Sequence, residues 1–460
     1  MRVVHVPFGY YPDPVGGTEV YVAELATALR AHGIESVVAA PALGDEPSAY
    51  MHGGVAVHRF PVGPMRDVAD LYGTGDATAA SAIDRVLADT GAAVLHLHAF
   101  TSASSLQALR AARRRGVAVA FTYHTPTASC VRGTLLRDGH LPCDGELLEQ
   151  RCASCLLESR GAADAVRAIL SRTPTAVGHA VAAAGGTGPW VTALRARELT
   201  RLRHDTFRRL LGEADAVVAV CDWVRALLLR AGARPSVVTL SRQGTLARGT
   251  RGARPRPSDT LRLAFMGRLH PTKGVHVVVK ALASKPMLRA ALDIFGVVQD
   301  DAAVRYSAEL RALAGDDLRV RFVPPVTPGN VVPTLASYDA TVVPSQWLET
   351  GPLTVLESFA AGVPVIGSNL GGIAELVGHD RDGWLVAHAD VDAWANALER
   401  LAGDPALVAR LTAGVRPPRT MDDVARDMAS IYETIARAPT HSRGEASTPR
   451  DGSMAASGAV

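Results

Sequence analysis

The stretch Pro344-Ser-Gln-Trp-Leu-Glu349-Thr-Gly-Pro-Leu-Thr-Val-Leu-Glu357-Ser358 is the part of this sequence that decides its fold. The apolar run Ala340–Val343 precedes it and predicts a buried strand. Pro352 predicts the start of a helix, because proline is favoured at the first helical position. The amides of Leu353 and Thr354 would then be unpaired, and together with the helix dipole they form a site for a phosphate.

The two glutamates of this stretch are separated by seven residues. Glu357 falls in the second helical turn, where its carboxylate can accept hydrogen bonds from both hydroxyls of a ribose. Glu349 falls in the loop before the helix, on the sugar side of the phosphate site. A solvated helix with two surface acids is the alternative. The order of strand, loop and proline-started helix favours a nucleotide-sugar site.

A second motif, Phe265-Met-Gly267-Arg268-Leu-His-Pro-Thr-Lys273-Gly274, follows the predicted strand Leu261–Met266. Gly267 allows the backbone to approach a ligand closely. Arg268 and Lys273 put two cations where a diphosphate would lie, and fixed cations stabilise a leaving group that gains negative charge. The alternative is a turn with two solvated cations. The chain has only three lysines, so a lysine within a motif stands out.

A third motif, Pro14-Val-Gly16-Gly17-Thr18-Glu19, follows the predicted first strand Val3–Pro7. Glycines directly before a helix form a turn that suits a phosphate. Gly-Gly before a helix is common, so the place of the motif after the first strand carries the argument.

Around these motifs the chain alternates apolar runs with amphipathic helices, which predicts parallel sheets with helices on both faces. The length of 460 residues predicts two domains. In such sheets ligands bind at the carboxyl ends of the strands, where all three motifs fall. The predicted strands are Val3–Pro7, Ser36–Ala39, Val55–Phe60, Val94–His98, Val117–Tyr123, Ala216–Val220, Leu261–Met266, Leu292–Phe295, Val320–Val323, Ala340–Val343, Val363–Ile366 and Gly383–Val386. The predicted divisions are residues 1–245 for the first domain with a cysteine-containing insertion at 125–210, 246–259 for a linker, 260–420 for the second domain, 421–436 for a last helix and 437–460 for a disordered tail.

The formal charge of +3 is small for this length and argues against a nucleic-acid partner. The N-terminal sequence lacks the pattern of a signal peptide, and no run of 18 apolar residues predicts a membrane span. We therefore expect a cytoplasmic protein with reduced thiols.

The three motifs, in this order, resemble retaining glycosyltransferase family 4, also described as glycosyl transferases group 1. The resemblance covers about residues 1–435 and implies an α/β protein of the GT-B fold, with two Rossmann-like domains facing across a cleft. It implies that the first domain is the acceptor side, that the second binds the nucleotide sugar, and that the last helix crosses back to the first domain. His124, in Tyr-His124-Thr-Pro, matches a family histidine beside the reacting centre of the sugar. The motifs and the resemblance together assign catalysis to His124, Glu349, Arg268 and Lys273, and donor binding to Gly16, Gly17, Gly267, Arg268, Lys273, Pro352, Leu353, Thr354 and Glu357.

The resemblance further implies attack from the front face of the sugar, without a catalytic divalent metal. Gly371-Gly372 and Glu375 match a further family segment and are expected to be structural. His96 and His98 share one face of a strand and are also expected to be structural, with the edge of the acceptor site as the alternative for His98. Two segments depart from the family pattern. Thr239-Leu-Ser-Arg-Gln-Gly244 replaces an Asn-Gly-Val-Asp-like turn, and Thr-Gly-Pro replaces Pro-Phe-Gly after Glu349.

Four of the five cysteines, Cys130, Cys143, Cys152 and Cys155, fall within 26 residues and end in a C-x2-C pair. In a reducing compartment this spacing predicts a structural zinc site. An iron–sulfur cluster is the second choice, and buried free thiols or a labile disulfide are the remaining alternatives.

The sequence thus predicts a retaining glycosyltransferase that uses a nucleoside-diphosphate sugar, with UDP preferred over GDP. Its acceptor would be a small molecule, a natural product or a glycan. A nucleotide-sugar epimerase and a non-catalytic nucleotide-sugar-binding protein are the alternatives. A basic helix could face an anionic membrane or a phosphorylated acceptor, although a solvated basic face is preferred; its arginines are Arg110, Arg113, Arg114 and Arg115. The oligomeric state is left open.

Overall fold

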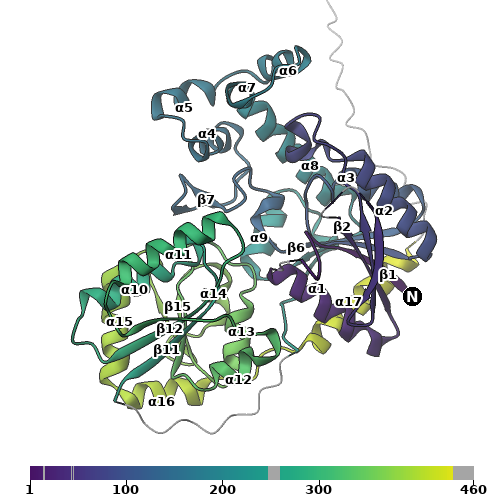
Figure 1. Ribbon diagram of the computed structural model, residues 1–460. Helices are drawn as coiled ribbons and strands as arrows, with labels where there is room; N and C mark the ends of the chain where they lie inside the picture. The colour runs from purple at the N-terminus through teal and green to yellow at the C-terminus, as the bar shows by residue number, and fades with distance from the viewer. Residues whose placement is uncertain (14–15, 43, 45, 247–258, 439–460) are drawn as a thin grey trace, which may run out of the picture.

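The computed structural model describes residues 1–13, 16–42, 44, 46–246 and 259–438, which form two α/β domains (Figure 1). Most of the predicted linker, 246–259, and nearly all of the predicted disordered tail, 437–460, lie outside the described residues. Each domain has a largely parallel sheet with apolar side chains buried on both faces. The predicted fold class, two Rossmann-like α/β domains, is confirmed.

In the described part of the chain, the first sheet has eight strands in the order β10-β9-β6-β5-β1-β2-β4-β3, and only β3 runs antiparallel to its neighbour. The strands β3 and β10 were not predicted. Both lie at an edge of the sheet and have few buried side chains, so they lack the apolar signal of a central strand. The bounds are β1 (Arg2–Val6), β2 (Glu35–Pro41), β3 (Ser48–His52), β4 (Val55–Phe60), β5 (Val94–Leu97), β6 (Ala118–Tyr123), β9 (Ala216–Ala219) and β10 (Val238–Leu240).

The first sheet is covered by helices that come from both ends of the chain. The helices α1 and α17 pack against each other, as do α2 and α3. The bounds are α1 (Gly17–Leu29), α2 (Ala77–Thr90), α3 (Leu106–Arg114), α9 (Asp222–Arg230) and α17 (Met421–Arg437).

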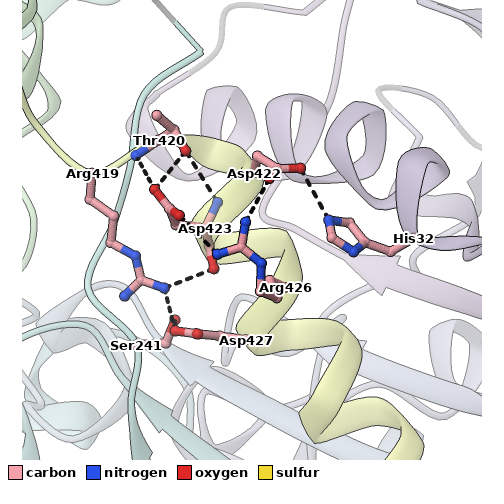
Figure 2. Close-up of polar contacts among 8 residues, drawn as sticks. All are labelled: His32, Ser241, Arg419, Thr420, Asp422, Asp423, Arg426 and Asp427. Atoms are coloured by element: carbon pink, nitrogen blue, oxygen red, sulfur yellow. Dashed lines mark hydrogen bonds and ion pairs between the residues drawn. The ribbon is translucent and has the colours of Figure 1, made fainter.

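The helix α17 follows the second domain in sequence but packs on the first (Figure 1). Val424, Met428 and Tyr432 are fully buried in the same core as α1. Its start is held by polar contacts, shown in Figure 2: a reciprocal cap between Thr420 and Asp423, and further contacts of the helix with the first domain. These further contacts are His32 Nε2 to Asp422 Oδ1 at 3.1 Å and Ser241 Oγ donating to Asp427 at 2.9 Å.

Between β6 and β9 the chain forms a helical extension of the first domain (Figure 1). Its core joins α4 and α8 through Leu156, Leu157 and Leu199. The bounds are β7 (Leu136–Arg137), β8 (Leu141–Pro142), α4 (Glu149–Ser159), α5 (Asp164–Leu170), α6 (Thr175–Ala183), α7 (Pro189–Leu194) and α8 (Ala196–Glu213).

The second sheet is entirely parallel, with the order β13-β12-β11-β14-β15-β16 among the described residues. The ends of β11 and β14 carry the two donor motifs and point into the cleft between the domains. The strands are β11 (Leu261–Arg268), β12 (Ala290–Val297), β13 (Val320–Val323), β14 (Ala340–Val343), β15 (Val365–Ser368) and β16 (Gly383–Val386). The helices are α10 (Val275–Ser284), α11 (Asp301–Ala314), α12 (Val331–Leu335), α13 (Leu353–Ala360), α14 (Gly371–Leu376), α15 (Val391–Gly403) and α16 (Pro405–Gly414).

Candidate active site

A cavity of about 800 Å³ lies between the two domains. The loops after β1 and β6 line it from the first domain, and the loops after β11 and β14 with the start of α13 line it from the second. All residues of the predicted catalytic and donor-binding sets line this one cavity: Gly16, Gly17, His124, Gly267, Arg268, Lys273, Glu349, Pro352, Leu353, Thr354 and Glu357.

Lys273 and Glu349, predicted from two separate motifs, form an ion pair with Nζ 2.6 Å from Oε1. Ser345 Oγ donates to the same oxygen at 2.7 Å. Glu349 is 7% exposed, and burial alone would raise its pKa. Lys273 and these hydrogen bonds outweigh burial and hold the pKa of Glu349 below its ordinary value, so the carboxylate is charged at neutral pH.

The turn at Gly274 brings the two motifs together. Its φ of +73° lies in the left-handed region, and a side chain there would overlap the carbonyl oxygen of Pro344. The Gln346 amide donates to the Thr272 carbonyl at 2.7 Å. The glycine therefore lets the Lys273 turn pack directly on the loop that carries Glu349.

The helix α13 begins at Leu353, and Pro352 takes the capping position before it rather than the predicted first helical position. Gly17 of the first domain lies across from this helix start, since a side chain at Gly17 would stand 3.8 Å from Leu353. Thr354 Oγ1 donates to the Met266 carbonyl at the end of β11, at 3.4 Å. The start of α13 thus faces the glycine motif of the first domain.

Glu357 lies on α13 in the field of Glu24, a half-buried residue of α1 that was not predicted. Burial, together with the charge of Glu24, raises the pKa of Glu357 to about 7. Burial also raises the pKa of Glu24 to about 7. Two neighbouring carboxyl groups, one from each domain, therefore have pKa values near neutrality. Glu24 has no sequence signal of its own, because it lies within an ordinary amphipathic helix.

His124 lies at the end of β6 and is 5% exposed. Its Nε2 is 3.1 Å from Nδ1 of His98, and its Nδ1 is 3.4 Å from the side-chain nitrogen of Gln243. Burial lowers the pKa of His124 to about 3, so the ring is neutral. Its carbonyl accepts a hydrogen bond of 2.6 Å from Thr350 Oγ1 of the second domain. Gln243 and Thr350 were missed as site residues, although each falls in a segment that departs from the family pattern.

Comparison with known proteins agrees with this geometry. The sequence model described as Glycosyltransferase Family 4 matches residues 15–244, half of the chain. The model described as Glycosyl transferases group 1 matches residues 250–416. The chain belongs to glycosyltransferase family 4. This glycosyltransferase is 28% identical over 413 residues to the D-inositol 3-phosphate glycosyltransferase of Thermobispora bispora, and the match covers 87% of this chain and 84% of that protein.

Two solved structures share the fold of this family 4 glycosyltransferase. One is sucrose-phosphate synthase from Thermosynechococcus elongatus, with a TM-score of 0.65, 20% identity, and coverage of 94% of this chain and 98% of that chain. The other is HepE from Anabaena in complex with UDP and glucose, with a TM-score of 0.61, 16% identity, and coverage of 95% and 99%. At these identities the likeness shows the fold alone, and the fold is GT-B.

In this glycosyltransferase the segment Gly371-Gly372 and Glu375 hold the Glu349 loop against the first domain. The Gly372 amide donates to the Glu349 carbonyl at 2.7 Å, and a side chain at Gly372 would stand 2.8 Å from that oxygen. The Glu375 carboxylate accepts from the amides of Asp222 and Trp223, each at 2.8 Å. A residue of the second domain therefore caps α9 of the first.

The four clustered cysteines of this glycosyltransferase are half-buried and form no disulfide among the described residues. Burial raises the pKa values of Cys143, Cys152 and Cys155, and the nearby Cys130 adds to the effect. Among the described residues, the only three His, Cys, Asp or Glu side chains with ligand atoms within 4.8 Å of one another are His5, His96 and His98. The sulfur atoms are gathered less tightly than that, so the zinc site stays a prediction.

The basic helix α3 of this glycosyltransferase is engaged with its own domain. Arg110 pairs with Glu213 at 2.6 Å, and Arg115 pairs with Asp84. Arg113 donates to the Glu213 carbonyl. Within the described ranges, no helix is long and apolar enough to cross a bilayer.

Proposed function

We propose that this glycosyltransferase moves a sugar from a nucleoside-diphosphate sugar, with UDP preferred over GDP, to a hydroxyl of a small-molecule, natural-product or glycan acceptor, with retention of configuration. The observation that carries this proposal is the single cavity that collects Arg268, Lys273, Glu349 and the start of α13. The HepE structure, in complex with UDP and glucose, supports UDP.

The donor would lie along the second domain. Glu357 would accept from the ribose hydroxyls, and the first amides of α13 would bind a phosphate. Lys273 and the exposed Arg268 would stabilise the diphosphate as it leaves. Because Lys273 is paired with Glu349, Glu349 would meet the sugar next to the diphosphate.

The reaction would proceed from the front face of the sugar. The bond between the anomeric carbon and the leaving phosphate oxygen breaks, and a bond from the same carbon to the acceptor oxygen forms on the same face. The acceptor proton passes to the leaving phosphate. His124, neutral at the cavity wall, would contact a hydroxyl near the reacting centre. Arg268 and Lys273 would supply the positive charge that this departure needs.

Thermal shift with UDP, GDP and a set of their sugars tests the donor site. We expect UDP and at least one UDP-sugar to stabilise the protein, and Glu357→Ala to abolish the shift. The exposed Glu309 provides the matched control, Glu309→Ala, which should keep the shift. Stabilisation by GDP alone would overturn the nucleotide assignment. A wild-type protein that no nucleotide stabilises would overturn the donor site itself.

We also infer that Cys130, Cys143, Cys152 and Cys155 hold a structural zinc. Four cysteines on one extension of the first domain supply the donor set of such a site. Metal analysis of the purified protein tests it, with Cys130→Ser expected to lose the metal and the separate, buried Cys221→Ser expected to keep it. Less than about half an equivalent of zinc per chain would contradict the inference. If the analysis finds iron and the protein absorbs visible light, the four cysteines hold an iron–sulfur cluster and the zinc inference is wrong.

A further inference from the structure

Three buried histidines form a row from the core of the first domain to the cavity. His5 on β1, His98 after β5 and His124 after β6 are 0%, 1% and 5% exposed. His5 Nδ1 lies 3.0 Å from His98 Nε2, and His98 Nδ1 lies 3.1 Å from His124 Nε2. The row exists because β1, β5 and β6 are adjacent parallel strands in register.

Each end of the row meets a polar side chain. At the core end, His5 Nε2 lies 3.2 Å from Ser36 Oγ. At the cavity end, His124 Nδ1 lies 3.4 Å from the amide nitrogen of Gln243, whose oxygen has no partner among the described residues. Every ring nitrogen of the row therefore takes part in one hydrogen bond.

The rings are neutral, since burial lowers the pKa of His5 and of His124 to about 3 and that of His98 well below its ordinary value. A neutral imidazole has one N–H and one lone pair, so the bonds of the row must all run in the same direction. If the Gln243 amide donates to Nδ1 of His124, then Nε2 of His124 donates to His98. His98 then donates to His5, and His5 donates to Ser36. One group at the cavity end sets the tautomer of all three rings.

A metal ion does not account for these rings. His96 completes the set of three with His5 and His98, but its nitrogens already bind Tyr432 OH at 2.6 Å and Thr122 Oγ1 at 2.7 Å. His5 and His98 bind each other. Burying such polar rings costs free energy that apolar side chains would not cost. The row thus needs a reason other than packing.

The cavity end of the row is built from the two segments that depart from the family pattern. Gln243 lies in the first, and its side chain fills the space over Gly351 in the second, where any Cβ would overlap the Gln243 oxygen. Thr350, beside Gly351, donates a hydrogen bond to the His124 carbonyl. The two departures fit each other, and both act on His124.

We propose that Gln243, His98 and His5 are positioning residues that hold His124 as its Nε2–H tautomer, so that His124 presents Nδ1 to the cavity as a hydrogen-bond acceptor. A substrate hydroxyl that takes the place of the Gln243 amide meets this lone pair. The part that concerns the substrate rests on the proposed function, because it requires sugar transfer in this cavity. The tautomer itself does not.

Nitrogen-15 NMR of histidine-labelled protein tests the tautomer, with His124→Gln used to assign the signal. We expect the Nε2–H form in the wild type. Gln243→Glu places a carboxylate at Nδ1, which can only accept, so it should reverse His124 to the Nδ1–H form. A wild-type Nδ1–H form, or a His124 tautomer that ignores Gln243→Glu, would overturn the proposal.

Kinetics test the consequence for the reaction. His98→Leu removes the partner of His124 Nε2 and should lower kcat about tenfold, the worth of one hydrogen bond to a positioned group, while the KM for the donor stays unchanged. His96→Leu is the matched control, since His96 is equally buried on β5 but lies outside the row, and it should leave kcat near the wild-type value. Equal losses of kcat in both variants would show that the histidine row serves only packing. A wild-type protein that binds no nucleotide would contradict the proposed function but would not affect the tautomer result.

Discussion

Lys273 Nζ lies 2.6 Å from Glu349 Oε1, which joins a cation and a buried acid of the cavity into one ion pair. Lys273 also lies 5.5 Å from the centre of the Trp347 ring. Lys273 therefore contacts two side chains of the loop after β14, Glu349 and Trp347. Through these contacts Lys273 links the loop after β11 to the loop after β14.

Removal of Lys273 should destabilise the fold, because it leaves the Glu349 carboxylate buried without a counter-charge. We expect Lys273→Met to lower the free energy of unfolding by about 3 kcal/mol, measured by urea unfolding near neutral pH. The double variant Lys273→Met/Glu349→Gln should recover most of this loss but no activity. The exposed Lys280→Met serves as control. A Lys273→Met protein as stable as the control would show that Glu349 finds another partner.

Donor binding should strengthen as the pH rises through about 7. Glu357 has its pKa raised to about 7 by burial and by Glu24, and its ionised form is the better acceptor for ribose hydroxyls. Glu24→Gln removes the neighbouring charge, so the midpoint of UDP affinity should move to lower pH. Calorimetric titration between about pH 5.5 and 8.5 measures the midpoint. Glu309→Gln should leave it in place, and an unmoved midpoint in Glu24→Gln would contradict the coupling.

The same pair gives a stability effect of opposite sign. Since the folded pKa values of Glu24 and Glu357 lie above the ordinary value of 4.5, their contribution to stability is fully present below about pH 4.5 and is lost as the pH rises through about 7. Glu24→Gln should therefore raise the Tm at pH 8 more than at pH 5. Equal Tm changes at both values would contradict this sign.

Glu375 should hold the two domains together through the start of α9. Glu375→Ala removes two hydrogen bonds from the amides of Asp222 and Trp223 and the ion pair with Arg242 at 2.8 Å. We expect a loss of about 2 kcal/mol in the free energy of unfolding and a larger radius of gyration in solution scattering. Glu375→Gln, which retains one acceptor oxygen, should show about half the loss. An unchanged radius in both variants would limit Glu375 to a local cap.

The buried histidines should make the protein sensitive to acid. The folded pKa values of His5 and His124 are lowered to about 3 by burial, so the unfolded chain binds more protons below about pH 6.5. Stability should fall as the pH drops from about 6.5 towards 3, by up to about 1.4 kcal/mol per pH unit for each such histidine. His5→Leu should flatten the dependence of Tm on pH, whereas His179→Leu, at an exposed position, should not. A parallel slope in His5→Leu would show that other groups dominate.

The strands of both sheets could be predicted where they are buried on two faces, because such strands are short apolar runs between turns. The edge strands β3 and β10 could not, since none of their side chains is buried. The donor motifs could be predicted for a related reason. A strand end, a glycine turn and a helix start lie next to one another in sequence, so their geometry is local.

The rest of the site depends on contacts between distant segments. In sequence, Glu24 is one more polar residue of a helix, and only the arrangement of the two domains brings its charge near Glu357. In sequence, His98 is typical of a core residue. Only the register of β1, β5 and β6 aligns it with His5 and His124. Gln243 lies more than 100 residues from both His124 and Gly351 in sequence. The departure from the family pattern drew attention to the segment that contains Gln243, but it did not show that Gln243 contacts His124 and Gly351.

The return of α17 to the first domain has a consequence for the order in which the chain folds during synthesis. The second domain has all of its described elements once α16 has left the ribosome at Gly414. The first domain, although made first, still exposes the apolar surface that Val424, Met428 and Tyr432 will cover. The domain that begins the chain is therefore the last to be completed, and a nascent chain stopped near residue 246 carries an open hydrophobic face that a chaperone would bind.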